Sequence, residues 1–169
     1  MNQEHSELSF CLLPPEKLHL IQDLWEQLNH HHASLPTPFA PEIAERGFES
    51  RLQAFRAKAA LGILRVEIAC TAEGVPPIAY CLASLSSDGV GEVDSLFVAP
   101  LSRRTGIGTK LLQRALDWLS DSGAVSLRVI VLYVNTEAES FYRRFGFEPR
   151  NIELEYRPKP HEGEFPRYL

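Results

Sequence analysis

Hydrophobic and polar positions alternate along some stretches of this chain and recur at helical spacing along others. In residues 61–71, Val66 and Ile68 alternate with charged residues, which is typical of a half-buried strand. Between residues 107 and 119, apolar side chains recur every three to four positions, which predicts an amphipathic helix. Glycines and prolines separate most of these stretches and mark the expected turns.

The pattern predicts the element order β-α-α-β-β-β-α-β-α-β. The expected strands are residues 6–13, 61–71, 78–86, 91–98, 125–134 (a buried strand rich in β-branched residues) and 147–156. The expected helices run from residue 18 to the 29–33 region and over 42–57, 107–119 and 136–145. Three consecutive strands with short turns imply an antiparallel meander, and the strand–helix–strand unit after them implies a parallel crossover. We therefore expect one mixed α/β domain over residues 1–169, with an irregular tail at 158–169.

The chain has 169 residues, of which 44% are hydrophobic and 23% charged, and its formal net charge is −5. This composition is typical of a soluble globular protein, and the acidic balance argues against a nucleic-acid partner. No apolar run is long enough to span a bilayer, so no membrane association is expected. Cys11, Cys70 and Cys81 lie far apart without metal-ligand spacing, which predicts reduced thiols, no metal and a cytoplasmic location.

Basic residues gather in residues 101–114, a segment without acids that follows an expected strand and leads into an expected helix. Glycines in such a loop let the backbone approach a phosphate, and the free N–H groups of the helix start attract it. The order Gly108-Thr109-Lys110 is not that of a Walker loop. Leu111 stands where a dinucleotide-binding fingerprint has its last glycine. The segment therefore predicts a site for a small anionic ligand of another kind.

Two motifs together resemble the GNAT superfamily of N-acetyltransferases. The first is R-x-x-G-x-G at residues 103–108, after a strand ending in L-x-V-x-P and before two leucines. The second, N-x-x-A-x-x-F-Y-x-x-x-G-F, runs from Asn135 to Phe147. Both motifs stand in the family's order, and so do the expected elements. The resemblance implies the GNAT fold, with a parallel strand pair splayed at a CoA cleft.

The resemblance also implies that acetyl-CoA is the cosubstrate. Its pyrophosphate would bind the glycine-containing loop and helix start, and its pantetheine arm the backbone of Leu96 and Val98. Asn135 corresponds to the family position that holds the CoA arm, although Asn is also a favoured helix N-cap. Lys110 and Arg114 are expected to be surface charges rather than contacts of the ribose phosphate. The expected cofactor-binding residues are Leu96, Phe97, Val98, Arg103, Arg104, Thr105, Gly106, Ile107, Gly108, Thr109, Asn135 and Tyr142.

Three residues are catalytic candidates. In the family, a tyrosine at the place of Tyr142 protonates the departing CoA thiolate; the alternative is a core aromatic residue like its neighbour Phe141. An acceptor amine is mostly an ammonium ion at neutral pH and must lose a proton before attack. Glu92 and Asp94 are two apart on one strand and so share a face, and either could take that proton. Glu92 is slightly preferred as the general base. The alternative is that both residues are ordinary acids at the edge of a hairpin, without a catalytic role.

Asn29 is followed by three histidines near the expected end of the first helix. Adjacent histidines on a helix cannot all bind one metal ion, so solvated imidazoles at a helix end are the simplest interpretation. The resemblance places the following loop beside the acceptor pocket. His30 and His32 are therefore candidate substrate-binding residues.

The resemblance implies direct transfer of an acetyl group from acetyl-CoA to a primary amine in a ternary complex. No cysteine falls in either motif, so no acyl-cysteine is expected. The acceptor, a small-molecule or peptide amine, is left open, although an acidic surface suits cationic amines. A homodimer, which many relatives form, is also left open. The alternative is a CoA-binding sensor or partner-binding module without transfer activity. A third interpretation, a nucleotide-binding protein, is disfavoured because the residue order of a Walker loop is absent.

Overall fold

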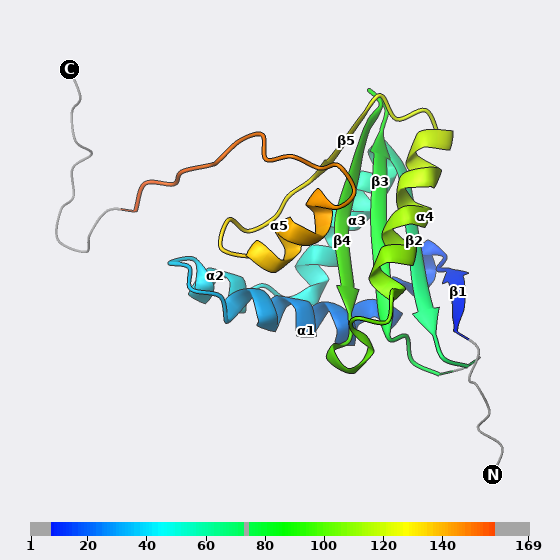
Figure 1. Cartoon of the computed structure of the whole chain (residues 1–169), viewed down its shortest axis with the longest axis horizontal. Coiled ribbons are helices and arrows are strands. Elements are labelled where there is room, and N and C mark those ends of the chain that lie inside the picture. The colour runs from blue at the N-terminus through cyan, green and yellow to red at the C-terminus, as the bar shows by residue number, and fades with distance from the viewer. Residues whose placement is uncertain (1–7, 73–74, 158–169) are drawn as a thin grey trace, which may run out of the picture.

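A five-stranded mixed sheet, in the order β1-β2-β3-β4-β5, runs through the computed structural model (Figure 1). Its strands are β1 (Ser9–Leu12), β2 (Gly62–Cys70), β3 (Ala79–Ser86), β4 (Val90–Val98) and β5 (Ser126–Val129). The strands β1 to β4 pair antiparallel, and β4 pairs with β5 in parallel. The expected meander and parallel crossover are confirmed.

The structure describes residues 8–72 and 75–157. The beginning of the first expected strand, Glu73 and Gly74 between the second and third expected strands, and the expected tail at residues 158–169 lie outside the described residues.

Helices cover both faces of the sheet (Figure 1). On one face lie the 3-10 helix η1 (Pro15–Ile21) and the helices α1 (Gln22–Ala33), α2 (Ala40–Ala44) and α3 (Phe48–Leu61). The other face carries α4 (Ile107–Asp121) and α5 (Thr136–Arg143), and a short 3-10 helix, η2 (Pro100–Ser102), precedes α4. Each face has its own apolar cluster, so the sheet is the middle of three layers. None of the helices within the described ranges is long and apolar enough to cross a bilayer.

The expected single helix at residues 42–57 is wrong, because the chain forms two helices there. α2 ends at Ala44 and α3 begins at Phe48. Between them Gly47 has φ −86° and ψ 150°, an extended conformation that interrupts the helical hydrogen bonds. The connection places Arg46 beside the cleft described below.

The expectation of a long buried strand at residues 125–134 is also wrong. β5 is short and is bonded to β4 alone within the described sheet. Its side chains are mostly exposed, since Leu127 retains 41% of its accessible surface and Ile130, just beyond the strand, 80%. β-branched composition predicted a strand correctly, but it could not distinguish a central strand from an edge strand.

Residues 147–156 form no strand, contrary to expectation. Ile152, Leu154 and Tyr156 alternate as in a strand, yet Leu154 is 90% exposed. A strand needs a neighbouring strand to bond its N–H and C=O groups, and no strand of the described sheet pairs with this segment. Arg157 instead donates a hydrogen bond to the carbonyl of Pro38, at 2.5 Å, and also contacts Glu42 of α2.

An ion pair with a buried acid joins α4 to the sheet. Glu67 of β2 is only 2% exposed, and Arg114 of α4 donates to its Oε1 from Nε at 2.7 Å. Arg65 approaches the other carboxylate oxygen, Oε2, at 3.3 Å. Arg114 was expected to be a surface charge, and its side chain is 47% exposed; the structure adds that it is the partner of a buried acid. This arginine therefore also has a structural role, because Glu67 is buried and needs a positive partner.

Candidate active site

A one-residue irregularity in β4 creates the site. Ala83 of β3 faces Val93 of β4, but the preceding Leu82 faces Ser95, so Asp94 is an extra residue in the ladder. Such a β-bulge bends the strand and re-aims the side chains beside it. On its other edge, β4 pairs with β5 only as far as Val93, which faces Val129. The two parallel strands therefore separate where the bulge lies, as the resemblance implied.

A cleft with a volume of about 1630 Å³ opens at this separation. Ligand pockets commonly measure about 300–1,000 Å³, so this one is large enough for two reactants. One part of its wall comes from the loop before α4 and from α5, and includes Gly106, Asn135 and Tyr142. Another part comes from α1, the α2–α3 connection and α3, and includes His32 and Arg46. Residues 92–98 of β4 lie between the two parts.

The loop at residues 99–106 is held by its own side chains. Arg103 donates from Nε to the carbonyl of Val98 at 3.1 Å and stacks on the ring of Phe97. Thr105 donates to the carbonyl of Ser102 at 2.7 Å. Arg104 and Gly106 both have positive φ, 63° and 84°, which turns the chain sharply into α4.

The N-terminus of α4 is suited to an anion. No side chain caps it, so the first N–H groups of the helix keep their donors free for a ligand. Gly108 packs closely on β4, since a Cβ there would lie 3.3 Å from Cγ2 of Val98. Six residues that the sequence analysis expects to bind the cofactor line the cleft: Arg103, Arg104, Gly106, Ile107, Gly108 and Thr109. Thr105 is not among the lining residues.

Asn135 and Tyr142 bracket α5 on the same wall. The Oδ1 atom of Asn135 accepts a hydrogen bond from the N–H of Ala138 at 3.1 Å, so this buried side chain is the N-cap of α5. Its amide nitrogen is left for another contact, because one Asn side chain has both an acceptor and donors. The two roles considered for Asn135 are therefore compatible.

Tyr142 is buried, and its ring packs against Phe141 and Phe147 at centroid distances of 5.3 and 5.8 Å. Burial, together with the nearby Cys81 and Tyr80, raises the pKa of the Tyr142 phenol well above its usual value. The hydroxyl group therefore stays protonated at neutral pH. No described side chain or backbone group forms a hydrogen bond with it, so its proton is free for a ligand in the cleft.

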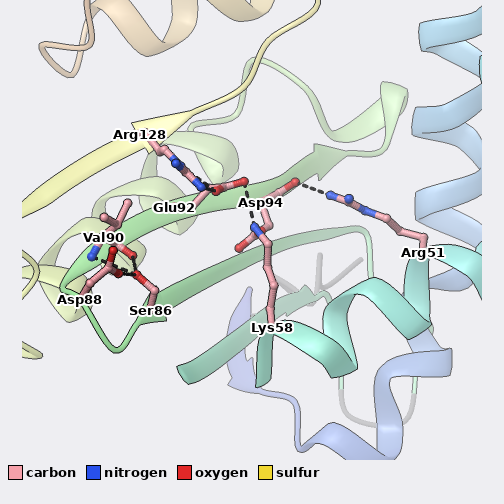
Figure 2. A network of polar contacts seen from close by, with 8 residues as sticks. All are labelled: Arg51, Lys58, Ser86, Asp88, Val90, Glu92, Asp94 and Arg128. Atoms are coloured by element: carbon pink, nitrogen blue, oxygen red, sulfur yellow. Dashed lines mark hydrogen bonds and ion pairs between the residues drawn. The ribbon is translucent and has the colours of Figure 1, made fainter. Parts of the chain in front are cut away.

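Glu92 and Asp94 belong to one charged network (Figure 2). Lys58 of α3 extends between them; its Nζ lies 2.9 Å from Oε1 of Glu92 and also contacts Oδ1 of Asp94. Arg128 of β5 binds Oε2 of Glu92 at 2.7 Å, and the guanidinium of Arg51 donates to the backbone carbonyl of Asp94 at 2.8 Å. Because Lys58 contacts both carboxylates, the two side chains share a face of the sheet, as expected.

The two carboxyl groups differ in proton affinity. Burial alone would raise the pKa of Glu92, but the hydrogen bonds and charges of Lys58 and Arg128 outweigh it and hold this pKa below its usual value. For Asp94 burial dominates and raises the pKa, although Lys58 and the hydroxyl of Ser84 oppose it. The Asp94 side chain is 1% exposed, and its Oδ2 has no hydrogen-bond partner among the described residues. Asp94 is therefore the more basic of the two.

The three histidines at the end of α1 lie in different surroundings. His31 and His32 line the cleft, whereas His30 is exposed and borders a separate shallow depression next to Arg103. Burial, with the charges of His31 and Arg46, lowers the pKa of His32 to about 4, so this imidazole is neutral at pH 7. Within residues 8–72 and 75–157, no group of three His, Cys, Asp or Glu side chains is arranged to hold a metal ion.

Sequence reasoning missed four basic residues. Arg46 and Arg51 line the cleft, and Lys58 and Arg128 pair with its acids. Arg51 and Lys58 are seven residues apart, two helical turns, so a shared face of α3 was a usable signal. Arg128 lies beside Glu92 because β4 and β5 pair in parallel in this register. No local pattern signals that contact. Phe97, an expected cofactor contact, has its side chain in the core on the α1–α3 side of the sheet.

Comparison with known proteins agrees with this architecture. The model of the acetyltransferase (GNAT) family matches residues 20–147, and the chain belongs to that family. Over 74 residues the chain is 32% identical to an uncharacterized N-acetyltransferase of Methanocaldococcus jannaschii, and over 73 residues 37% identical to a mycothiol acetyltransferase of Arthrobacter sp.. These stretches cover 42% and 41% of this chain but only 31% and 22% of those relatives.

A solved structure, AAC(6')-Iy in complex with the bisubstrate analog CoA-S-monomethyl-acetylneamine, has the same fold. Its TM-score against this chain is 0.64, and the superposition covers 90% of this chain and 99% of the other. Sequence identity is 20%, so this likeness concerns the fold alone.

The left-handed turn at Gly106 offers a test of the phosphate loop. In Gly106→Ala, a φ of 84° strains the new residue by roughly 1–2 kcal/mol although no atom lies within 4 Å of the added Cβ. We expect lower stability and a distorted loop, with acetyl-CoA bound about ten-fold more weakly, as measured by calorimetry.

Gly123→Ala is the matched control. Gly123 has a φ of 86° and equal space around its Cβ, but it lies at the far end of α4. The control should lose similar stability and keep its acetyl-CoA affinity. Equal losses of affinity in both variants would show that the loop at Gly106 has no special part in binding.

Proposed function

We propose that this protein transfers an acetyl group from acetyl-CoA to a primary amine by direct attack in a ternary complex. The observation that carries the proposal is the separation of β4 from β5 after Val93, which opens one cleft to a phosphate-type loop, to Tyr142 and to Asp94. Membership of the GNAT acetyltransferase family supports it.

The residues present fit acetyl-CoA. The uncapped start of α4 and the glycines at 106 and 108 leave room and donors for the pyrophosphate. Beyond Val93, the edge of β4 has no β5 partner in the described sheet, so backbone groups there can pair with the pantetheine amides like an added strand. The bisubstrate complex of the structural neighbour supports the same type of cosubstrate. When bound, acetyl-CoA supplies an acetyl group activated as a thioester.

Asp94 is proposed as the general base. Lys58 occupies Oδ1, and Oδ2 remains for the proton of the acceptor ammonium, reached directly or through a water molecule. The neutral amine nitrogen then bonds to the thioester carbonyl carbon. A backbone N–H near Val98 is proposed to stabilise the carbonyl oxygen. The C–S bond breaks as the carbonyl re-forms, and Tyr142 donates its proton to the departing sulfur. The extra proton on the amide nitrogen passes through water to the Tyr142 oxygen, which restores the phenol.

The cysteines favour direct transfer over an acyl-enzyme. Cys81 is buried in the core, and burial strongly raises its thiol pKa. Burial also raises the pKa of the Cys70 thiol. A protonated thiol is a poor nucleophile. Cys11 is exposed on β1 and does not line the cleft.

Two measurements on the purified protein test the proposal. Calorimetry should show acetyl-CoA binding, and a thiol-release assay over a panel of primary amines should show turnover with an N-acetylated product. Tight binding without release for every amine would favour the CoA-binding module without transfer activity. Failure to bind acetyl-CoA would contradict both functions.

Tyr142→Phe removes the proposed proton donor and keeps the ring packing. We expect the rate of thiol release to fall about 10²-fold, since general acid catalysis contributes on that scale, with unchanged acetyl-CoA affinity. Tyr133→Phe, at an exposed tyrosine outside the cleft, is the control and should keep full activity. If both variants were equally active, Tyr142 would be only a core residue.

Asp94→Asn removes the proposed base and should lower kcat about 10²- to 10³-fold. The base acts only when ionised, so wild-type kcat should fall as the pH is lowered through the raised pKa of Asp94. The variant should lose this acid limb of its pH profile.

Glu92→Gln is the comparison for Asp94→Asn, because Glu92 shares Lys58 with Asp94 but has a lowered pKa. It should reduce kcat less and retain the acid limb. The opposite pattern, with the limb lost only in Glu92→Gln, would transfer the role of base to Glu92.

A further inference from the structure

The wall of the cleft formed by α1, the α2–α3 connection and α3 is called the acceptor wall here. Its charged side chains are the arginines Arg46 and Arg51, whereas the acids of the cleft near it, Glu92 and Asp94, lie on β4. We propose that the acceptor amine also carries a carboxylate, and that Arg46 and Arg51 bind it. This inference rests on the proposed acetyl transfer and specifies its substrate class.

The two acids do not make this part of the cleft negative. Lys58 and Arg128 both pair with Glu92, and Lys58 also pairs with Asp94. Two cations thus face two carboxylates. The charges of this network therefore cancel without a contribution from the arginines of the acceptor wall. An amine that carries several positive charges would find no unpaired carboxylate there.

The two arginines keep their binding capacity. Arg46 has no acidic partner among the described residues, and it is exposed. Arg51 lies 4.4 Å over the ring of Phe55 and donates only to the backbone carbonyl of Asp94. That contact uses one of its N–H groups and adds no negative charge. A guanidinium group binds a carboxylate through two parallel hydrogen bonds, which is the contact that both residues have free.

The neighbouring histidines are consistent with this local charge. The positive charge of Arg46 is among the causes that lower the pKa of His32, after burial and His31. His32 is neutral at pH 7 and is free to donate or accept a hydrogen bond. The net charge of −5 therefore misrepresents the site, because the acceptor wall is locally basic.

Matched acceptors test the inference. The probes are L-amino acids and ω-amino acids of two to five carbons, each compared with its carboxamide, and spermidine as a polycation. With acetyl-CoA present, thiol release should give a kcat/KM for carboxylate forms at least ten-fold above that for the carboxamides. In Arg46→Gln, the KM for the carboxylate forms should rise about 10- to 100-fold, while the KM for carboxamides and the affinity for acetyl-CoA stay unchanged.

Arg56→Gln is the matched control, since Arg56 is an exposed arginine of α3 that does not line the cleft. It should leave all of these constants unchanged. Arg46→Glu is a second variant and should reverse the preference towards spermidine.

Three outcomes would overturn the inference while acetyl-CoA still binds: carboxamides or spermidine used as well as the carboxylates, Arg46→Gln impairing both acceptor forms alike, or no carboxylate-bearing acceptor turned over. Absence of acetyl-CoA binding would instead reject the proposed function, and this inference with it.

Discussion

The extra residue in β4 is the constraint on which the site depends. If Asp94 did not interrupt the ladder between Val93 and Ser95, β4 would continue in register with β3. The bulge coincides with the end of pairing between β4 and β5, so it lies where the cleft opens. Asp94 itself is the extra residue, which aims its carboxylate at Lys58 and its carbonyl at Arg51. The bulge in β4 thus lies where the cleft opens and also places the carboxylate and carbonyl of Asp94 beside it.

Burial then gives the groups around this opening their different proton affinities. Tyr142 and Asp94 are both buried, and burial favours the neutral form of each, so both pKa values are raised. Glu92 is also desolvated, but two cations hold it ionised. It shares Lys58 with Asp94 and links β4 to β5 through Arg128. Two acids close together on one strand thus differ in proton affinity.

Much of the fold was predictable because its signals are local. Alternating apolar and polar residues predicted β2 to β4, and apolar residues at helical spacing predicted α4 and α5. The short turns between the strands predicted the antiparallel meander. Two of the failures depend on neighbours distant in sequence: Leu127 is exposed because β5 is an edge strand, and no strand of the described sheet pairs with residues 147–156. The third, the extended backbone at Gly47 that divides the expected helix, is a local feature. Alternation of apolar and polar residues with a period of two shows that a segment can form a strand. It does not show which strand will pair with it.

The family resemblance and the expected position of the phosphate loop could be inferred before the fold was known, because glycine spacing and motif order are features of the chain. The sequence also placed Glu92 and Asp94 on one face, since side chains alternate along a strand. Three other features follow from the tertiary structure: Lys58 and Arg128 pair with Glu92, Arg114 pairs with Glu67, and Arg46 lines the cleft. These contacts join residues from different elements. Charge acts through space, so its effect on a site is fixed only when the chain has folded.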